Sequence, residues 1–126
     1  MAYSAKQLLG LILSNAGCPG KTVHQGSGPM NISFDANDGL VIRSLLLNCA
    51  AKPTTAEDFV IRHQIPGSGP EFDVLRFQQD MGEGDGVKSV VIDDPIFVSK
   101  GDRLVLEWDN SDNVSWGVIL IHGRNA

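Results

Sequence analysis

The segment VSKGDRLVLEWDNSDNVSWGVILI (residues 98–121) contains two apolar runs on either side of a polar turn. In the first run Leu104, Leu106 and Trp108 lie two residues apart, so in an extended chain they point to one face. The same period of two continues after the turn in Val114, Trp116, Val118 and Leu120. This period is typical of strands that have one face in a protein core. The segment therefore predicts two antiparallel strands that each contribute one face to a core.

The two tryptophans stand at matching distances from the middle of this turn. If the turn is centred on Asp112, Trp108 lies opposite Trp116, and both indoles join the apolar face. We therefore predict a buried cross-strand aromatic pair near one end of the domain. The alternative is that the indoles face solvent and form a platform for a sugar or another partner.

The second run is apolar on its other face as well. Ile119 and Ile121 alternate with Leu120, so they point away from the expected core. A strand with two apolar faces is either central under a cover or part of a subunit contact. Ile119 and Ile121 are therefore candidate residues for contact with another subunit or a partner.

Gly, Pro, Asn and Asp interrupt the rest of the chain about every eight to twelve residues, with short apolar runs between them. This spacing, without any alternation of strand and helix patterns, is typical of an all-β domain. We expect a single antiparallel two-sheet sandwich, similar to a jelly roll, because many short strands with one apolar face bury it best against another sheet. Strands are predicted at residues 30–34, 40–48, 59–65, 72–79, 87–92, 96–98, 104–108 and 114–122, within a total of seven to nine.

The N-terminal residues differ from this pattern. Lys6 is followed by the run LLGLIL, which is short for a signal peptide, and Asn15 stands where a lipoprotein signal needs leucine. We therefore predict an arm over residues 1–20, before a sandwich domain over 21–126. The arm could hold a short helix capped by Ser4, or a strand, and would pack on its own domain or on a neighbouring chain. Its candidate contact residues are Leu8, Leu9, Leu11, Ile12 and Leu13.

Charge and cysteine content exclude several classes of partner. The net charge is −5 and the ten lysines and arginines are scattered, so we expect no binding to nucleic acid or to an anionic membrane surface. No apolar stretch approaches the length of a membrane span. Cys18 and Cys49 lack the spacing of a zinc site. Two free thiols are favoured, with a single disulfide as the alternative.

Reactive motifs are missing from the sequence. His24, His63 and His122 are far apart and form no HxH or HExxH pattern. There is no GxSxG sequence, and no glycine-rich loop is followed by the Lys-Ser/Thr that binds phosphate. These observations predict a protein that is not an enzyme and has no cofactor.

The turn between the two tryptophans partly matches a calcium-binding loop. Asp109, Ser111 and Asn113 occupy the first three alternate positions of an EF-hand-like loop. Val114 stands where the loop needs glycine, and Leu120 stands where it needs glutamate. The motif is therefore incomplete, and we predict no metal site.

Two long segments carry a resemblance to a known group of proteins. They are AKPTTAEDFVIRHQIPGSGPEFDVLRFQQDM and, after it, SVVIDDPIFVSKGDRLVLEWDNSDNVSWGVILI. Their order resembles small β-sandwich proteins encoded among the virion structural genes of tailed bacteriophages. The match covers about two thirds of the chain, roughly residues 40–121. Its pieces are Pro53 to Thr55 with Asp58, Asp73 to Leu75, Pro95 to Asp102, Asn110, Asp112, and Trp116 with Gly117.

The resemblance implies a virion protein, most similar to the decoration (cement) proteins of phage heads. Such a protein lies on the capsid surface, binds the major capsid protein, and commonly forms homotrimers. These proteins have no catalytic motif, so no functional residue is carried over. The alternative function is a carbohydrate-binding or receptor-binding module of a phage tail or baseplate that uses Trp108 or Trp116.

Overall fold

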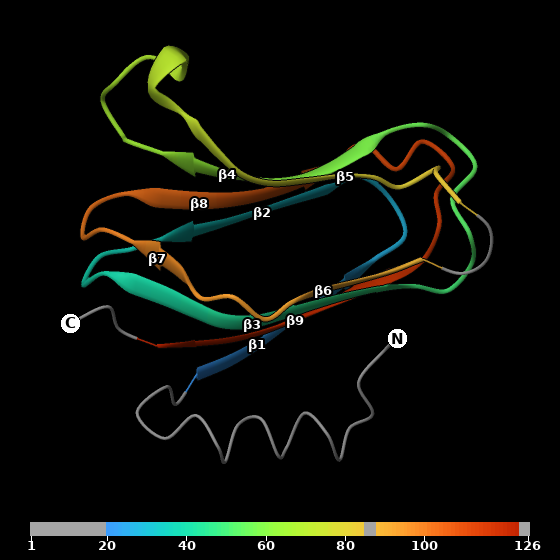
Figure 1. Cartoon of the computed structure of the whole chain (residues 1–126), viewed down its shortest axis with the longest axis horizontal. Helices are drawn as coiled ribbons and strands as arrows, with labels where there is room; N and C mark the ends of the chain where they lie inside the picture. Colours follow the sequence, from blue (N-terminus) through green and yellow to red (C-terminus); the bar gives the residue numbers. More distant parts are fainter. Residues whose placement is uncertain (1–19, 85–87, 124–126) are drawn as a thin grey trace.

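The computed structural model describes residues 20–84 and 88–123, and within them it has nine strands and one short 3-10 helix. The strands form two antiparallel sheets that lie face to face (Figure 1). The chain is therefore an all-β two-sheet sandwich, as its sequence predicts. The elements are β1 (Gly20–Gly26), β2 (Met30–Asp35), β3 (Leu40–Cys49), β4 (Asp58–Gln64), η1 (Pro70–Phe72), β5 (Val74–Asp80), β6 (Ser89–Ile92), β7 (Ile96–Val98), β8 (Arg103–Trp108) and β9 (Trp116–Gly123).

The strand order is that of a jelly roll. One sheet has the order β1-β9-β3-β6, and the other has β2-β8-β4-β5. β7 pairs with the start of β3 and β6 with its end, so the two short strands together fill one position in the sheet. Pro95 lies in the break between them, where a residue without a backbone N–H interrupts the strand. Eight strand positions wound between two four-stranded sheets make the double Greek key of a jelly roll.

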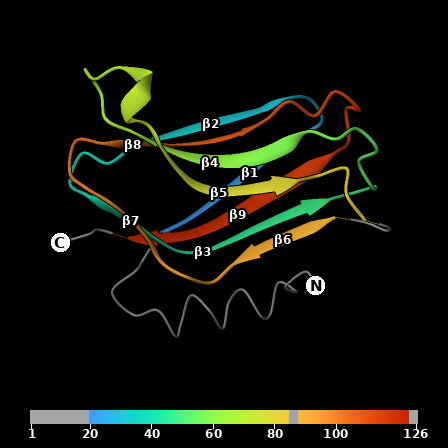
Figure 2. The same ribbon diagram turned by 45° about the horizontal axis from the view of Figure 1, so that its top comes forward.

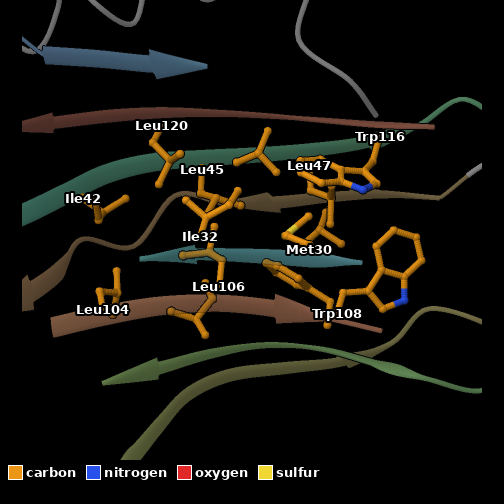
Figure 3. Close-up of a cluster of buried hydrophobic side chains, with 14 of the residues drawn as sticks. Met30, Ile32, Ile42, Leu45, Leu47, Leu104, Leu106, Trp108, Trp116 and Leu120 are labelled. Atoms are coloured by element: carbon orange, nitrogen blue, oxygen red, sulfur yellow. The ribbon is translucent and has the colours of Figure 1, made fainter. Parts of the chain in front are cut away.

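The core lies between the sheets (Figure 3). β3 and β9 contribute alternate residues from one side, and β4 and β8 contribute them from the other. Close packing of such side chains is the main favourable term in folding a domain of this size. The members with no exposed surface are Leu47, Phe59, Ile61, Met81, Val98, Leu104, Leu106, Val118 and Leu120.

Most predicted strands agree with the observed ones to within two residues, with three differences. β1 was not predicted, because its sequence GKTVHQG has a single large apolar residue and forms an edge strand. Phe72 lies in η1 instead of at the start of β5. β1 also begins at Gly20, so this residue belongs to the sandwich and not to the arm.

The expected hairpin between the two tryptophans is wrong, because β8 and β9 belong to different sheets. Residues 109–115 cross from one sheet to the other. Trp108 pairs with Met30 of β2, whereas Trp116 pairs with Gly26 of β1 and Cys49 of β3. Both indoles are nonetheless in the core, with Trp108 2% and Trp116 8% exposed.

The arm residues Leu8, Leu9, Leu11, Ile12 and Leu13 lie outside the described part of the chain, as does Cys18. In the described part, no helix has the length and apolar character to cross a membrane.

Candidate functional site

The loops at one end of the sandwich are tied together by the carboxylate of Asp112. Its Oδ2 accepts the backbone N–H groups of Thr54 at 2.8 Å and Thr55 at 2.9 Å, and the two hydroxyls donate to the same carboxylate. Backbone hydrogen bonds, that from Thr55 first, lower the pKa of Asp112 from 3.8 to about 2. Asp112 is thus a charged anchor between the β3–β4 and β8–β9 loops.

Asn110 is a buried residue that connects loops at the same end of the sandwich. It is buried, with a φ of 45°, a left-handed conformation that asparagine tolerates better than most residues. Its Nδ2 donates to the carbonyl oxygens of Gly28 and Val114, both at 2.9 Å, and its Oδ1 accepts the N–H of Val114 at 3.1 Å. Trp116 Nε1 also donates to the Gly28 carbonyl, at 2.9 Å. The β1–β2 loop is therefore joined to the β8–β9 loop.

Glu57 completes what we name the loop network, which consists of Thr54, Thr55, Glu57, Asn110, Ser111, Asp112 and Trp116. The carboxylate of Glu57 accepts the N–H of Ser111 at 3.0 Å and also its hydroxyl. Five of these residues belong to the motifs that carry the phage resemblance. Their spacing therefore has a structural cause: they hold loops together across the end of the sandwich.

A second polar cluster, which the sequence did not indicate, joins three strands. His63 Nε2 and Asp102 Oδ2 are 2.8 Å apart, and Arg76 Nη1 lies 3.0 Å from His63 Nδ1. Since a guanidinium can only donate, Nδ1 accepts and Nε2–H donates to Asp102. Arg76 also donates to the carbonyl of Phe97 at 3.1 Å, so it links β5 to β7 across the open side of the sandwich. Both ring nitrogens of His63 are used, and neither is available as a base.

The other two histidines lie elsewhere in the sandwich. His24 meets the ring of Phe34 edge-on, with centroids 5.9 Å apart. His122 Nε2 lies 2.7 Å from the hydroxyl of Thr22, and burial lowers the pKa of His122. Across residues 20–84 and 88–123, no three His, Cys, Asp or Glu side chains lie close enough together to hold a metal ion.

A groove of about 480 Å³ lies between β5 and the β6–β7 strands. Figure 2 shows these strands on the same side of the sandwich. Arg76 and Phe77 line the groove from β5, and Asp93 and Asp94 line it from the break before β7. A smaller recess of about 280 Å³ lies beside Trp116. Because Trp116 is only 8% exposed, its indole offers no face on which a sugar could stack.

The outer faces of the two sheets differ in chemistry. The outer face of β2-β8-β4-β5 carries ion pairs, Arg62 with Glu107 at 3.1 Å and Arg103 with Asp35 at 2.8 Å. The outer face of β1-β9-β3-β6 instead carries what we name the apolar row: Val23, Ile119, Leu46 and Val91, one from each strand.

The two isoleucines named as partner contacts both lie on this second outer face. Ile119 is half-buried and belongs to the apolar row, whereas Ile121, two residues along β9, is only 1% exposed. Contact of Ile119 or Ile121 with another subunit or partner stays a prediction.

The largest exposed apolar side chains gather in a segment that the sequence did not single out. Four of them lie within residues 65–75, two in the connection from β4 to β5 and two at the start of β5. They are Ile65 at 43%, Phe72 at 57%, Val74 at 51% and Leu75 at 47% exposed, and we name them the apolar tip. The only signal in the sequence was a glycine- and proline-rich loop, PGSGP, next to apolar residues.

No protein-family model matches this chain, and no curated protein matches its sequence.

Proposed function

We propose that this protein is a non-enzymatic structural subunit of a phage virion, a decoration protein that binds the head surface through protein–protein contacts. The observation that carries the proposal is the apolar tip. Four large apolar side chains are exposed within eleven residues, and exposed apolar surface of this kind is typical of sites that bind another protein.

The tip has the position that a binding element needs. The β4–β5 connection extends beyond the sheets at one end of the sandwich (Figure 1). The capsid would then meet the tip, and the polar face of β2-β8-β4-β5 would remain in water. A specific contact needs about 1,000 Å² of buried surface, so further residues must surround the tip.

The polar side chains of the described residues support a scaffold function. Asp112, Glu57 and Asn110 are used to hold loops, and His63 is used to join strands. A scaffold fixed in this way loses little conformational freedom when it binds, which favours tight association.

The first test is the location and copy number of the protein. Quantitative mass spectrometry of purified tailed-phage particles that carry it is expected to give hundreds of copies per particle. A handful of copies would indicate a tail tip or baseplate protein, and absence from the particles would overturn the proposal.

The second test uses two valines matched in exposure. Val74, in the tip, is 51% exposed, and Val23, on the opposite edge strand β1, is 48% exposed. Particles stripped of the protein are incubated with each variant, and bound protein is measured after sedimentation. Val74→Asp is expected to lower binding at least tenfold, whereas Val23→Asp keeps it. Equal binding by the two variants would exclude the tip as the contact.

A further inference from the structure

We propose that residues 1–19 of the same chain cover the outer face of the β1-β9-β3-β6 sheet, with their apolar run over the apolar row. This inference concerns the single chain and does not depend on the proposed function.

The apolar row crosses the whole sheet in register. Val23 pairs with Ile119, Ile119 pairs with Leu46, and Leu46 pairs with Val91. Directly paired side chains on one face of a sheet are close neighbours, so the four form one continuous stripe. Ile121 extends the stripe along β9.

Burial along this face is highest at its centre. Leu46 is 3% exposed and Ile121 is 1% exposed, whereas Val23 and Val91, on the edge strands, are 48% and 36% exposed. The burial of central side chains that point away from the core requires other atoms above β9 and β3.

The neighbouring side chains along β3 and β9 are too small to supply those atoms. Leu46 is flanked along β3 by Ser44 and Asn48, and Ile121 is followed on the same face by Gly123. None of these three reaches far over its neighbour.

On the β2-β8-β4-β5 sheet, by contrast, a central apolar side chain of the outer face is covered by its own neighbours. Val105, at the centre of its outer face, is 5% exposed, but its neighbours are Arg62, Arg103 and Glu107. The long aliphatic stems of such residues cover apolar surface while their charged groups stay in water. Leu46 instead pairs with Ile119 and Val91, which have no such stems. Lys21, which pairs with Ile121, is exposed on the edge strand β1, two strands away from Leu46.

No described strand lies over the apolar row (Figures 1 and 2). The rest of the chain consists of residues 1–19, 85–87 and 124–126, and only the first of these is long enough to cover several strands. It also contains the run LLGLIL, residues 8–13, which supplies the apolar surface that the row requires.

The chain length allows this arrangement within one molecule. Residues 1–19 join the sandwich at Gly20, the start of β1, and β9 is the next strand in the sheet. Residues 14–19 can span up to about 20 Å, whereas β3 lies only about 10 Å from β1. A covalently joined segment also has a high effective concentration at a surface within its reach, which favours docking in the same chain over exchange between chains.

Paramagnetic relaxation in the full-length chain tests this placement. A nitroxide is attached at Gln7→Cys in a Cys18→Ser background, where the only other thiol, Cys49, is buried. With isotope-labelled methyl groups, the signals of Leu46, Ile119 and Ile121 are expected to lose intensity strongly, and that of Val105 much less. A nitroxide at Ser33→Cys, on the outer face of the other sheet, is the matched control and should reverse the order.

Two results would overturn the proposal. One is equal broadening of Leu46 and Val105 by the Gln7 label. The other is broadening that appears only when nitroxide-bearing chains are mixed with separately isotope-labelled chains, because the segment would then dock on a neighbour. Leu9→Ser with Ile12→Ser should abolish the selective broadening, and its persistence would exclude the apolar run as the contact. No phage particle is used, so these outcomes are separate from those of the virion tests.

Discussion

Asp112 holds Thr55 with both of its carboxylate oxygens, since Oδ1 accepts the hydroxyl at 2.8 Å and Oδ2 accepts the backbone N–H at 2.9 Å. The two residues are 57 positions apart, and their contact joins loops that leave different sheets. The loop network therefore depends on a charge, and its contribution to stability should depend on pH.

The first prediction follows from the pKa of Asp112, which folding lowers from 3.8 to about 2. The folded state binds this proton less readily than the unfolded state, so the stabilisation is complete above about pH 4 and is lost as the pH falls towards 2. Asp112→Asn should lower the urea midpoint at pH 7, and the difference from the native chain should shrink between pH 4 and 2. The control is the substitution Asp109→Asn. Asp109 is an exposed carboxylate at the start of the same loop, and its replacement should not lower the urea midpoint at pH 7. A difference in urea midpoint between Asp112→Asn and the native chain that stays constant down to pH 2 would contradict the lowered pKa of Asp112.

The second prediction concerns Asn110. Replacement by alanine removes three hydrogen bonds and leaves buried backbone groups without partners. Alanine also tolerates the positive φ of this position less well than asparagine does. The expected loss in free energy of unfolding is about 2–4 kcal/mol. Asn110→Gly should cost less, because glycine adopts this φ without strain. Asn113, also at positive φ but exposed, provides the control: Asn113→Gly should change stability by less than about 0.5 kcal/mol.

The third prediction compares the two indoles. Trp116 Nε1 donates to Gly28, whereas Trp108 Nε1 is buried without a hydrogen-bond partner among the described residues. Trp116→Phe should therefore destabilise the fold by about 1 kcal/mol more than Trp108→Phe, as measured by denaturant unfolding. In the native chain both indoles should emit at short wavelength and resist quenching by iodide and by added sugars. Strong quenching by a sugar would instead favour the receptor-binding alternative.

The fourth prediction concerns Cys49, whose pKa burial raises to about 11. At pH 8 about one thiol in a thousand would then be ionised, and the thiolate is the reactive form. In a Cys18→Ser chain, a disulfide reagent should label Cys49 only after urea is added. Rapid labelling of the folded chain would mean that β3 opens near its end.

The homotrimer remains a prediction from the phage resemblance. Three chains of 13.5 kDa give a particle of about 40 kDa, which light scattering after gel filtration distinguishes from a monomer. A monomer at micromolar concentration would restrict any trimer to the surface of the virion.

The period of two in β8 correctly placed Leu104, Leu106 and Trp108 in the core, because alternation decides which face of a strand is buried. It could not decide which strand lies beside β8. The sequence suggested β9 across a short turn, whereas the neighbours are β2 and β4, about forty residues away in the chain or farther. Strand partners in a jelly roll are set by the packing of both sheets together, and no local pattern contains that information.

For the loop network, too, the sequence showed the residues but not their contacts. The order of the PTT, Asn-x-Asp and Trp-Gly pieces was visible in the sequence, but their purpose was not. Only the fold brings Thr54 and Asp112 to within a hydrogen bond. The apolar tip was missed for a different reason. Phe72 and Val74 match the pattern of a strand, but Phe72 lies in η1 and Val74 begins the edge strand β5, and no local pattern shows that both are exposed.

The position of β9 between β1 and β3 has a consequence for biosynthesis. The ribosome makes this strand after all the others, yet it occupies an interior position in its sheet. Until it emerges, the nascent chain keeps β1 and β3 with unpaired edges, which are prone to pair with other molecules. The sandwich should therefore close in a late step, on the millisecond-to-second timescale of folds dominated by distant pairings.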